Sequence, residues 1–180
     1  MTNLKIRKVM IIRKATGEEM LSLWGYEGME NASFTAKYFY QNIISGNAVF
    51  WTLDNEGELI GELYVFLDLD DKDFADGTDR AYLCAFRVNA EYRGQGLGSK
   101  LMMKATTELK EKGFRSTTIG VSNDEPQKIK MYHHMGFTVK IKDCYYDPCG
   151  FDKNGNPIYE EAGWWLLSKE LYQNFSHTNI

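Results

Sequence analysis

The sequence predicts an α+β fold of mixed α/β character, in which a mixed, mostly antiparallel sheet carries helices on both faces. Two apolar, aromatic-rich segments between residues 47 and 69 flank Asp54-Asn55-Glu56-Gly57, a pattern typical of a β-hairpin. From residue 80 to residue 137 the apolar pattern changes between strand and helix periods, in the order strand, helix, strand, helix. Together with further strands at both ends, these segments predict a sheet with both pairing directions.

The N-terminal elements follow the same logic. The run "KVMIIRKA" (residues 8–15) predicts a first strand, and the segments 15–28 and 33–46 predict two short helices, each ending near glycine. These two helices precede the hairpin, and we expect them to lie close together because the link between them is short.

The C-terminal half begins with a strand at "RAYLCAFRVN" (80–89). A helix follows, with Leu97, Leu101, Ala105 and Leu109 on one face and a stop at Gly113. The remaining elements are a strand at 115–122, a helix at 125–137, and strands at 137–142 and 160–171 around a turn-rich loop, 147–158.

Length and composition limit the function classes. With 180 residues and 43% hydrophobic content, we expect a single domain spanning residues 1–180. The net charge of -4 argues against a nucleic-acid-binding protein, and the three cysteines do not form a disulfide framework. Because the longest apolar run near the start is "VMII", we expect no membrane segment and a cytoplasmic protein.

The segment "YRGQGLGS" (92–99) places three glycines at alternate positions between a strand and a helix. Free amides and the positive dipole end at a helix start favour a phosphate, and glycines let it approach the backbone. The phosphate loop of kinases and ATPases requires Gly-Lys-Ser/Thr beginning five residues after Gly94, where this sequence has Ser99, so that motif is absent. A dinucleotide-binding fingerprint requires glycine at the same position, so it fits only in part. A tight turn at a well-packed helix start is the structural alternative.

A third pattern fits. Arg93-Gly94-Gln95-Gly96-Leu97-Gly98 matches Gln/Arg-x-x-Gly-x-Gly/Ala, and "VNAEYRGQGLGSKLM" resembles the GCN5-related N-acetyltransferase (GNAT) superfamily. The resemblance runs through most of the chain and implies a GNAT-like acyl-CoA N-acyltransferase fold that uses acetyl-CoA and no metal. It also implies that the coenzyme A pyrophosphate lies on Arg93, Gly94, Gln95, Gly96, Leu97, Gly98 and Ser99, and that the pantetheine arm lies along Phe86, Arg87 and Val88.

The resemblance extends to "KMYHHMGF", where Tyr132 occupies the position of the family's tyrosine that protonates the leaving thiolate. A core tyrosine is the alternative. The family often has asparagine where Glu125 stands, so Asn123 is the candidate for the pantetheine contact, or else a helix cap. The place of the family's strand glutamate reads Tyr82, and no general base is assigned. Glu62, Asp79 or a water remain candidates.

The resemblance therefore implies an acetyl-CoA-dependent N-acetyltransferase that acts on a primary amine of a small molecule or peptide. A non-catalytic acyl-CoA-binding sensor or interaction module is the alternative, favoured by the absent strand glutamate. For the acceptor, the acidic segment 68–79 would attract amines, but a solvated loop is the preferred explanation. Trp24, Tyr26, Glu27 and Glu30 could recognise an amine or simply pack two helices. One of Trp164 and Trp165 is expected at the surface or in a homodimer contact.

Overall fold

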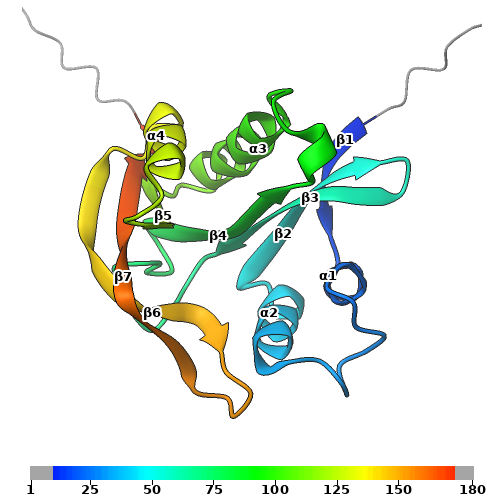
Figure 1. Ribbon diagram of the computed structural model, residues 1–180. Helices are drawn as coiled ribbons and strands as arrows, with labels where there is room; N and C mark the ends of the chain where they lie inside the picture. The colour runs from blue at the N-terminus through cyan, green and yellow to red at the C-terminus, as the bar shows by residue number, and fades with distance from the viewer. Residues whose placement is uncertain (1–9, 173–180) are drawn as a thin grey trace, which may run out of the picture.

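The structure is a computed structural model that describes residues 10–172 (Figure 1). Within this range the chain forms the following elements: β1 (Met10–Ala15), α1 (Gly17–Leu23), α2 (Phe34–Ile44), β2 (Ala48–Asn55), β3 (Glu58–Phe66), β4 (Arg80–Val88), a short 3-10 helix (Ala90–Tyr92), α3 (Leu97–Glu111), β5 (Ser116–Ser122), α4 (Pro126–His134), β6 (Val139–Phe151) and β7 (Pro157–Glu170). Lys8 and Val9, part of the expected first strand, lie outside the described residues.

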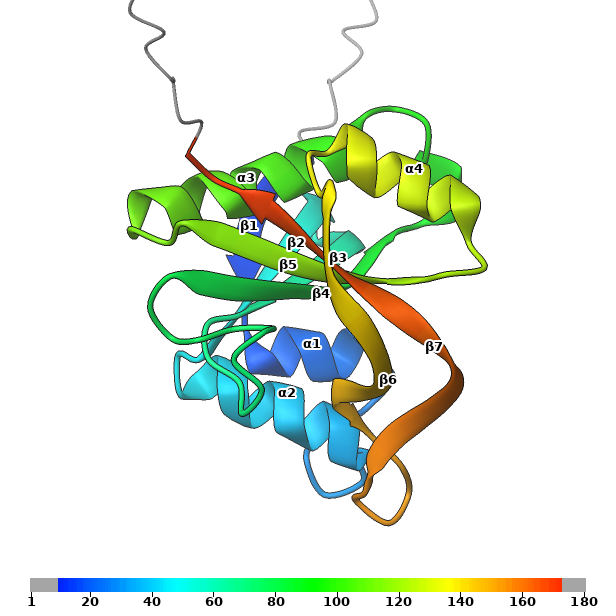
Figure 2. The ribbon, with the colours of Figure 1, turned by 90° about the vertical axis from the view of Figure 1, so that its left-hand side faces the viewer.

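The described strands form one sheet in the order β1-β2-β3-β4-β5-β7-β6. Every neighbouring pair is antiparallel except β4 and β5, which are parallel because α3 crosses between them. Helices α3 and α4 cover one face and α1 and α2 the other (Figures 1 and 2). The predicted fold class is therefore confirmed.

The β2–β3 hairpin shows how local sequence sets the turn. Glu56 and Gly57 both adopt positive φ, 56° and 94°, as a two-residue hairpin turn of this hand requires. The Asp54 carboxylate accepts a 2.6 Å hydrogen bond from the Gly57 amide and so fixes the turn. The hairpin predicted around Asp54-Asn55-Glu56-Gly57 is confirmed.

Two apolar cores lie on opposite sides of the sheet. On the α3 and α4 side, Leu101 and Phe137 are fully buried, whereas Met20 and Phe39 are buried beneath α1 and α2. Helix α1 begins with a capping box, in which Thr16 and Glu19 each accept the other's backbone amide. In the described part of the chain, no helix is long and apolar enough to cross a membrane.

The C-terminal strands are longer than the sequence predicts. The segment 147–158 was expected as a turn-rich loop, but β6 continues to Phe151 and β7 starts at Pro157, so most of that expectation is wrong. Pro148 and Gly150 favour turns locally, yet β6 accommodates them through shifts in its register with β7. The two strands form a curved arm that reaches α2 (Figure 2).

We expect Leu101→Ala to lower the free energy of unfolding by about 2–5 kcal/mol, because Leu101 on α3 is fully buried and its removal leaves a cavity. Met103 on the same helix is 62% exposed, and Met103→Ala should change stability by no more than about 0.5 kcal/mol. Urea unfolding of both variants measures the difference. Equal stability losses would contradict the assignment of this helix face to the core.

Candidate active site

The glycine segment forms the turn from β4 into α3. Gly94 and Gly96 both have φ of 74°, in the left-handed region that glycine enters without strain. Gly96 is the N-cap of α3, and a Cβ built on either glycine would meet no atom within 4 Å. The backbone at these two glycines is therefore open to a ligand.

The start of α3 offers free hydrogen-bond donors. The first helical bond runs from the Lys100 amide to the Gly96 carbonyl, at 3.1 Å, so the amides of Leu97, Gly98 and Ser99 precede the helical ladder. The first turn contains no acidic side chain. With the macrodipole of a 15-residue helix behind them, these amides can bind an anion such as a diphosphate.

Gly98 has a different environment from the other two glycines. A Cβ at Gly98 would lie 3.0 Å from Cζ of Phe86 and 3.5 Å from Cγ2 of Val88. Its missing side chain thus lets α3 pack closely on the end of β4. Arg93 reinforces this junction because its Nε donates a 2.8 Å hydrogen bond to the Val88 carbonyl.

The parallel strands β4 and β5 separate beside this loop. Their pairing covers Arg80–Leu83 against Ser116–Ile119, although β4 continues to Val88 and β5 to Ser122. At the point of divergence Ala85 has φ of 48°, and the β3–β4 register shifts there. A non-glycine residue in this conformation costs roughly 1–3 kcal/mol, and such strain concentrates at functional sites. The result is a gap between the strands, along Phe86, Arg87 and Val88.

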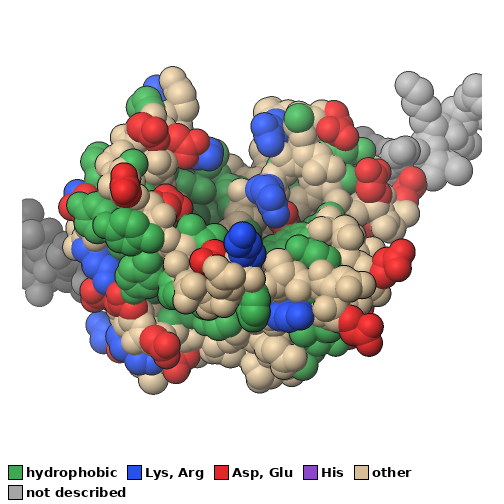
Figure 3. All heavy atoms as spheres, turned by 60° about the horizontal axis from the view of Figure 1, so that its bottom comes forward, with side chains coloured by type: hydrophobic (Ala, Val, Ile, Leu, Met, Phe, Trp, Pro, Cys, Tyr) green, Lys and Arg blue, Asp and Glu red, His purple; other side chains and the backbone are tan. Residues whose placement is uncertain are grey.

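A cavity of about 350 Å³ opens where the strands diverge, and we call it the splay cavity. Its lining residues come from the diverging strands, from the α1–α2 region, from α4 and from β6: Trp24, Thr35, Phe39, Tyr82, Leu83, Cys84, Ala85, Phe86, Arg87, Ile119, Gly120, Tyr132, Asp147 and Cys149. The face of the molecule that carries α1 and α2 is visibly hollowed (Figure 3). Residues that are far apart in the sequence thus meet at this cavity.

Tyr132 on α4 reaches this cavity. Its side chain packs beside the rings of Phe86 and Phe137, with centroids 6.5 and 6.1 Å away, and only 7% of the residue is exposed. Burial raises the pKa of Tyr132 to about 12, so the hydroxyl keeps its proton at neutral pH. No described residue forms a hydrogen bond with this hydroxyl, which is therefore available to a ligand. Tyr132 is therefore both packed in the core and part of the cavity lining.

Asn123 lies at the end of β5, outside the splay cavity lining. Its Nδ2 donates a 3.3 Å hydrogen bond to the Ala162 carbonyl of β7. The N-cap of α4 is Glu125, which makes no side-chain capping bond. Asn123 therefore links β5 to β7, and the expectation that it caps the helix is wrong.

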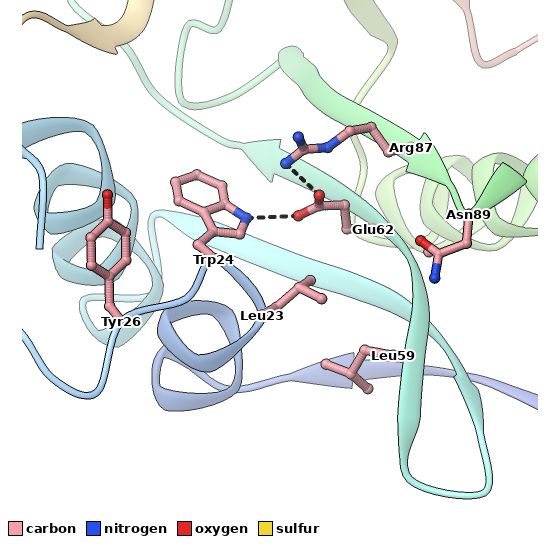
Figure 4. A pocket seen from close by; sticks show the side chains of 8 residues that line it. Leu23, Trp24, Tyr26, Leu59, Glu62, Arg87 and Asn89 are labelled. Atoms are coloured by element: carbon pink, nitrogen blue, oxygen red, sulfur yellow. Dashed lines mark hydrogen bonds and ion pairs between the residues drawn. The ribbon is translucent and has the colours of Figure 1, made fainter.

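A second cavity, of about 510 Å³, shares Trp24 and Arg87 with the splay cavity. It is lined by Leu23, Trp24, Tyr26, Leu59, Gly61, Glu62, Arg87 and Asn89 (Figure 4). Glu62 is 6% exposed, and its carboxylate accepts hydrogen bonds from Trp24 Nε1 at 2.9 Å and from the Tyr64 hydroxyl at 2.8 Å. Arg87 completes the cluster with a 2.5 Å ion pair. Of the four candidates for amine recognition, Trp24 and Tyr26 line this cavity, whereas Glu27 and Glu30 do not.

The acidic segment is largely engaged in structural contacts. Asp71 accepts from Lys142 Nζ at 2.6 Å and from the Tyr146 hydroxyl at 2.7 Å, and Asp73 accepts from the same lysine. Asp76 accepts the backbone amides of residues 78–80. These contacts fasten Asp71 and Asp73 to β6, whereas Asp70 and Asp79 are exposed to solvent, so the solvated-loop interpretation holds for part of the segment. Asp79 lines neither cavity.

The structure also places the remaining candidates. Trp164 is buried in the core beside α2, and Lys140 lies 4.8 Å from the ring of its partly buried neighbour, Trp165. Among residues 10–172, no group of three or more His, Cys, Asp or Glu side chains is placed to hold a metal ion. The candidate catalytic and coenzyme-binding groups therefore lie in the splay cavity and the glycine loop.

Sequence reasoning missed two features of the site. The first is the left-handed backbone at Ala85 within β4, which helps to open the gap. Left-handed positions are usually predicted from glycine, and this one is an alanine. Asp147 was placed in a loop but lines the splay cavity from β6. In the sequence, Asp147 stands next to Pro148 in a segment that favours turns. Nothing in that pattern predicts that its carboxylate lies near Tyr132.

A mixed sheet with one diverging parallel pair beside a glycine loop defines the fold class of the acyl-CoA N-acyltransferases. The family described as Acetyltransferase (GNAT) family matches residues 15–137, and the chain belongs to this family. The family resemblance in the sequence is therefore confirmed. No curated protein matches the sequence.

Solved structures agree in fold. The N-acetyltransferase PaiA from Thermoplasma acidophilum, in complex with coenzyme A, is 16% identical, with a TM-score of 0.60 over 90% of this chain and 99% of that chain. The ribosomal-protein-S18-alanine N-acetyltransferase from Escherichia coli is 15% identical, with a TM-score of 0.62 over 96% and 100% of the two chains. Arabidopsis thaliana NAA60, in complex with a bisubstrate analogue, is 15% identical, with a TM-score of 0.60 over 90% and 99%.

Proposed function

We propose that this protein is an acetyl-CoA-dependent N-acetyltransferase that transfers the acetyl group directly to a primary amine of a small molecule or peptide. The observation that carries the proposal is the position of Tyr132 in the lining of a cavity that opens where β4 and β5 separate, beside the open glycine loop. Family membership supports acetyl transfer in general.

The diphosphate of the coenzyme fits the glycine loop. The free amides at the start of α3 would hold it, and Gly94 and Gly96 leave the space that it needs. The pantetheine arm fits the gap beside Phe86, Arg87 and Val88, where β4 has left its partner strand. Acetyl-CoA supplies a thioester as the acyl donor, and this route directs that thioester toward the splay cavity.

Tyr132 is suited to act as the general acid. A hydroxyl with a pKa raised to about 12 stays protonated at neutral pH, and it can donate that proton to a thiolate as it leaves. A group of this kind typically contributes about 10²- to 10⁴-fold to the rate. Holding the amine beside the thioester supplies a further part of the catalysis.

The acceptor would enter from the side of Trp24. This residue lines both cavities, as does Arg87, which pairs with Glu62 of the second cavity. Aromatic rings and polar groups of this kind suit an amine attached to a small polar body or to a peptide end. The two cavities together offer room for both reactants.

The test is release of coenzyme A thiol from acetyl-CoA, with spermidine, kanamycin, L-lysine and a lysine-containing peptide as acceptors. We expect turnover with at least one amine class, and acetyl-CoA binding by calorimetry without any amine. Binding without turnover on any acceptor would instead support the alternative of an acyl-CoA sensor, against which the free Tyr132 hydroxyl argues.

A further inference from the structure

Asp147 enters the splay cavity from the far end of the chain. The β6–β7 arm bends away from the edge of the sheet and reaches α2 (Figures 1 and 2). There the Thr35 hydroxyl donates to the Phe151 carbonyl at 3.1 Å, and the Phe151 amide donates to the same hydroxyl oxygen at 2.9 Å. This reciprocal contact fixes the arm, and with it the strand segment that carries Asp147.

The carboxylate of Asp147 is held in a defined orientation. One oxygen accepts a 2.9 Å hydrogen bond from the Cys149 amide, and the Gly150 amide also hydrogen-bonds the carboxylate. The side chain lies so close over Gly150 that any Cβ there would clash with it. The backbone of β6 thus determines the position of this carboxylate.

Asp147 differs from Glu62 in its charge partners. Glu62 is paired with Arg87 and accepts two further hydrogen bonds, so both of its oxygens are engaged. Among the described residues, no Lys, Arg or His forms an ion pair with Asp147. Asp147 is therefore the carboxylate of the splay cavity without a cation, and an incoming ammonium would supply one.

The surroundings of Asp147 favour proton uptake. Burial raises the pKa of its carboxyl above the ordinary value, although the two backbone amides oppose the shift. Tyr82 of β4 and Cys149 face it, and burial also raises the pKa of both, so they stay neutral at pH 7. Lys128 of α4 and Glu160 of β7 line an adjoining hollow shared with Asp147, and Lys128 is paired with Glu125.

We propose that Asp147 is the catalytic proton acceptor for the amine, placed in the same cavity as Tyr132. This inference rests on the proposed acetyltransferase function and assigns the base that the sequence left open. Both residues line the splay cavity, and both also line the adjoining hollow. An amine between them would thus contact one proton acceptor and one proton donor.

The proton balance requires both groups. The acceptor ammonium gives one proton to Asp147, and the nitrogen lone pair then forms the C–N bond with the acyl carbon. The C–S bond breaks with its electron pair on sulfur, which takes the Tyr132 proton. The nitrogen loses its second proton, which restores the tyrosine through solvent, and Asp147 releases its own proton to solvent. The products are one amide, one thiol and one proton.

The test replaces Asp147 by asparagine and measures kcat/KM for the best amine of the acceptor panel between pH 6 and 10. We expect Asp147→Asn to lower kcat/KM by about 100-fold at pH 7, with acetyl-CoA affinity within about twofold of wild type. The deficit should shrink as the pH approaches the pKa of the acceptor ammonium, because neutral amine then needs no base. Asp143→Asn, on the exposed part of the same strand, is the matched control and should behave as wild type.

A second variant keeps the proposal testable if asparagine disturbs folding. Asp147→Ser can still accept the Cys149 amide and leaves space for a small carboxylate. We expect added formate to raise its activity about 10-fold compared with an equal concentration of chloride, and to leave wild type unchanged. Rescue by formate would not accompany a purely structural role.

The outcomes separate the two proposals. Wild type that transfers to no amine overturns the acetyltransferase function and the role of Asp147 with it. Active wild type with an equally active Asp147→Asn variant overturns the role of Asp147 alone. A deficit that is the same at every pH also overturns proton acceptance, because it would indicate a structural role that does not depend on the protonation of the amine.

Discussion

Tyr132→Phe is expected to lower kcat about 10³-fold while acetyl-CoA affinity stays within about twofold of wild type. The substitution removes one hydroxyl from the splay cavity and retains the ring that packs beside Phe86 and Phe137. The leaving thiolate would then lack its proton donor, whereas the binding surface would be unchanged. Thiol release under saturating amine, with calorimetry for acetyl-CoA, measures the two effects separately.

The matched control is Tyr172→Phe. The Tyr172 hydroxyl donates to the Lys110 carbonyl at the other end of α3, and this tyrosine is 44% exposed. Its replacement should leave kcat within about twofold of wild type. If Tyr132→Phe kept more than a third of the wild-type kcat, the hydroxyl would not be the proton donor.

The pH dependence of the same reaction gives a further check on Tyr132. Its acid form is the active one, and that form persists below a pKa of about 12. Loss of this proton therefore should not reduce kcat at pH 9 or 10. An alkaline limb in wild type near pH 8 that disappears in Tyr132→Phe would contradict the raised pKa.

The local elements of the fold could be predicted because short-range chemistry determines them. The hairpin turn at Glu56-Gly57 needs positive φ, and Leu101 and Leu109 follow the helix period. The glycine loop could be placed for the same reason, since Gly96 stands between a strand and the first turn of an amphipathic helix. These features depend on residues that are neighbours in sequence.

Long-range features could not be predicted in this way. The divergence of β4 from β5 depends on the pairing of β4 with β3 and on an alanine with φ of 48°, which local propensity argues against. Asp147 reaches the splay cavity only because the β6–β7 arm bends and binds Thr35, which lies more than 100 residues earlier in the chain. For Gly98, the motif predicted the position of the glycine in the loop but not its close approach to Phe86.

A negative charge placed at the start of α3 should repel the diphosphate of acetyl-CoA. Gly96→Asp is expected to weaken acetyl-CoA binding about 10³-fold, about 4 kcal/mol, because a carboxylate about 4 Å from a diphosphate repels it by that amount at a protein surface. Gly96→Asn has nearly the same shape and is uncharged, and asparagine and aspartate both tolerate the left-handed backbone found there. The affinity of the asparagine variant for acetyl-CoA should therefore fall by no more than about 10-fold.

Calorimetry at low and high salt measures the affinity of both variants for acetyl-CoA. The difference in affinity between them should narrow as salt screens the charges. Equal affinities for the two variants would place the diphosphate away from this loop, because both side chains meet the same left-handed backbone at this N-cap and differ in charge.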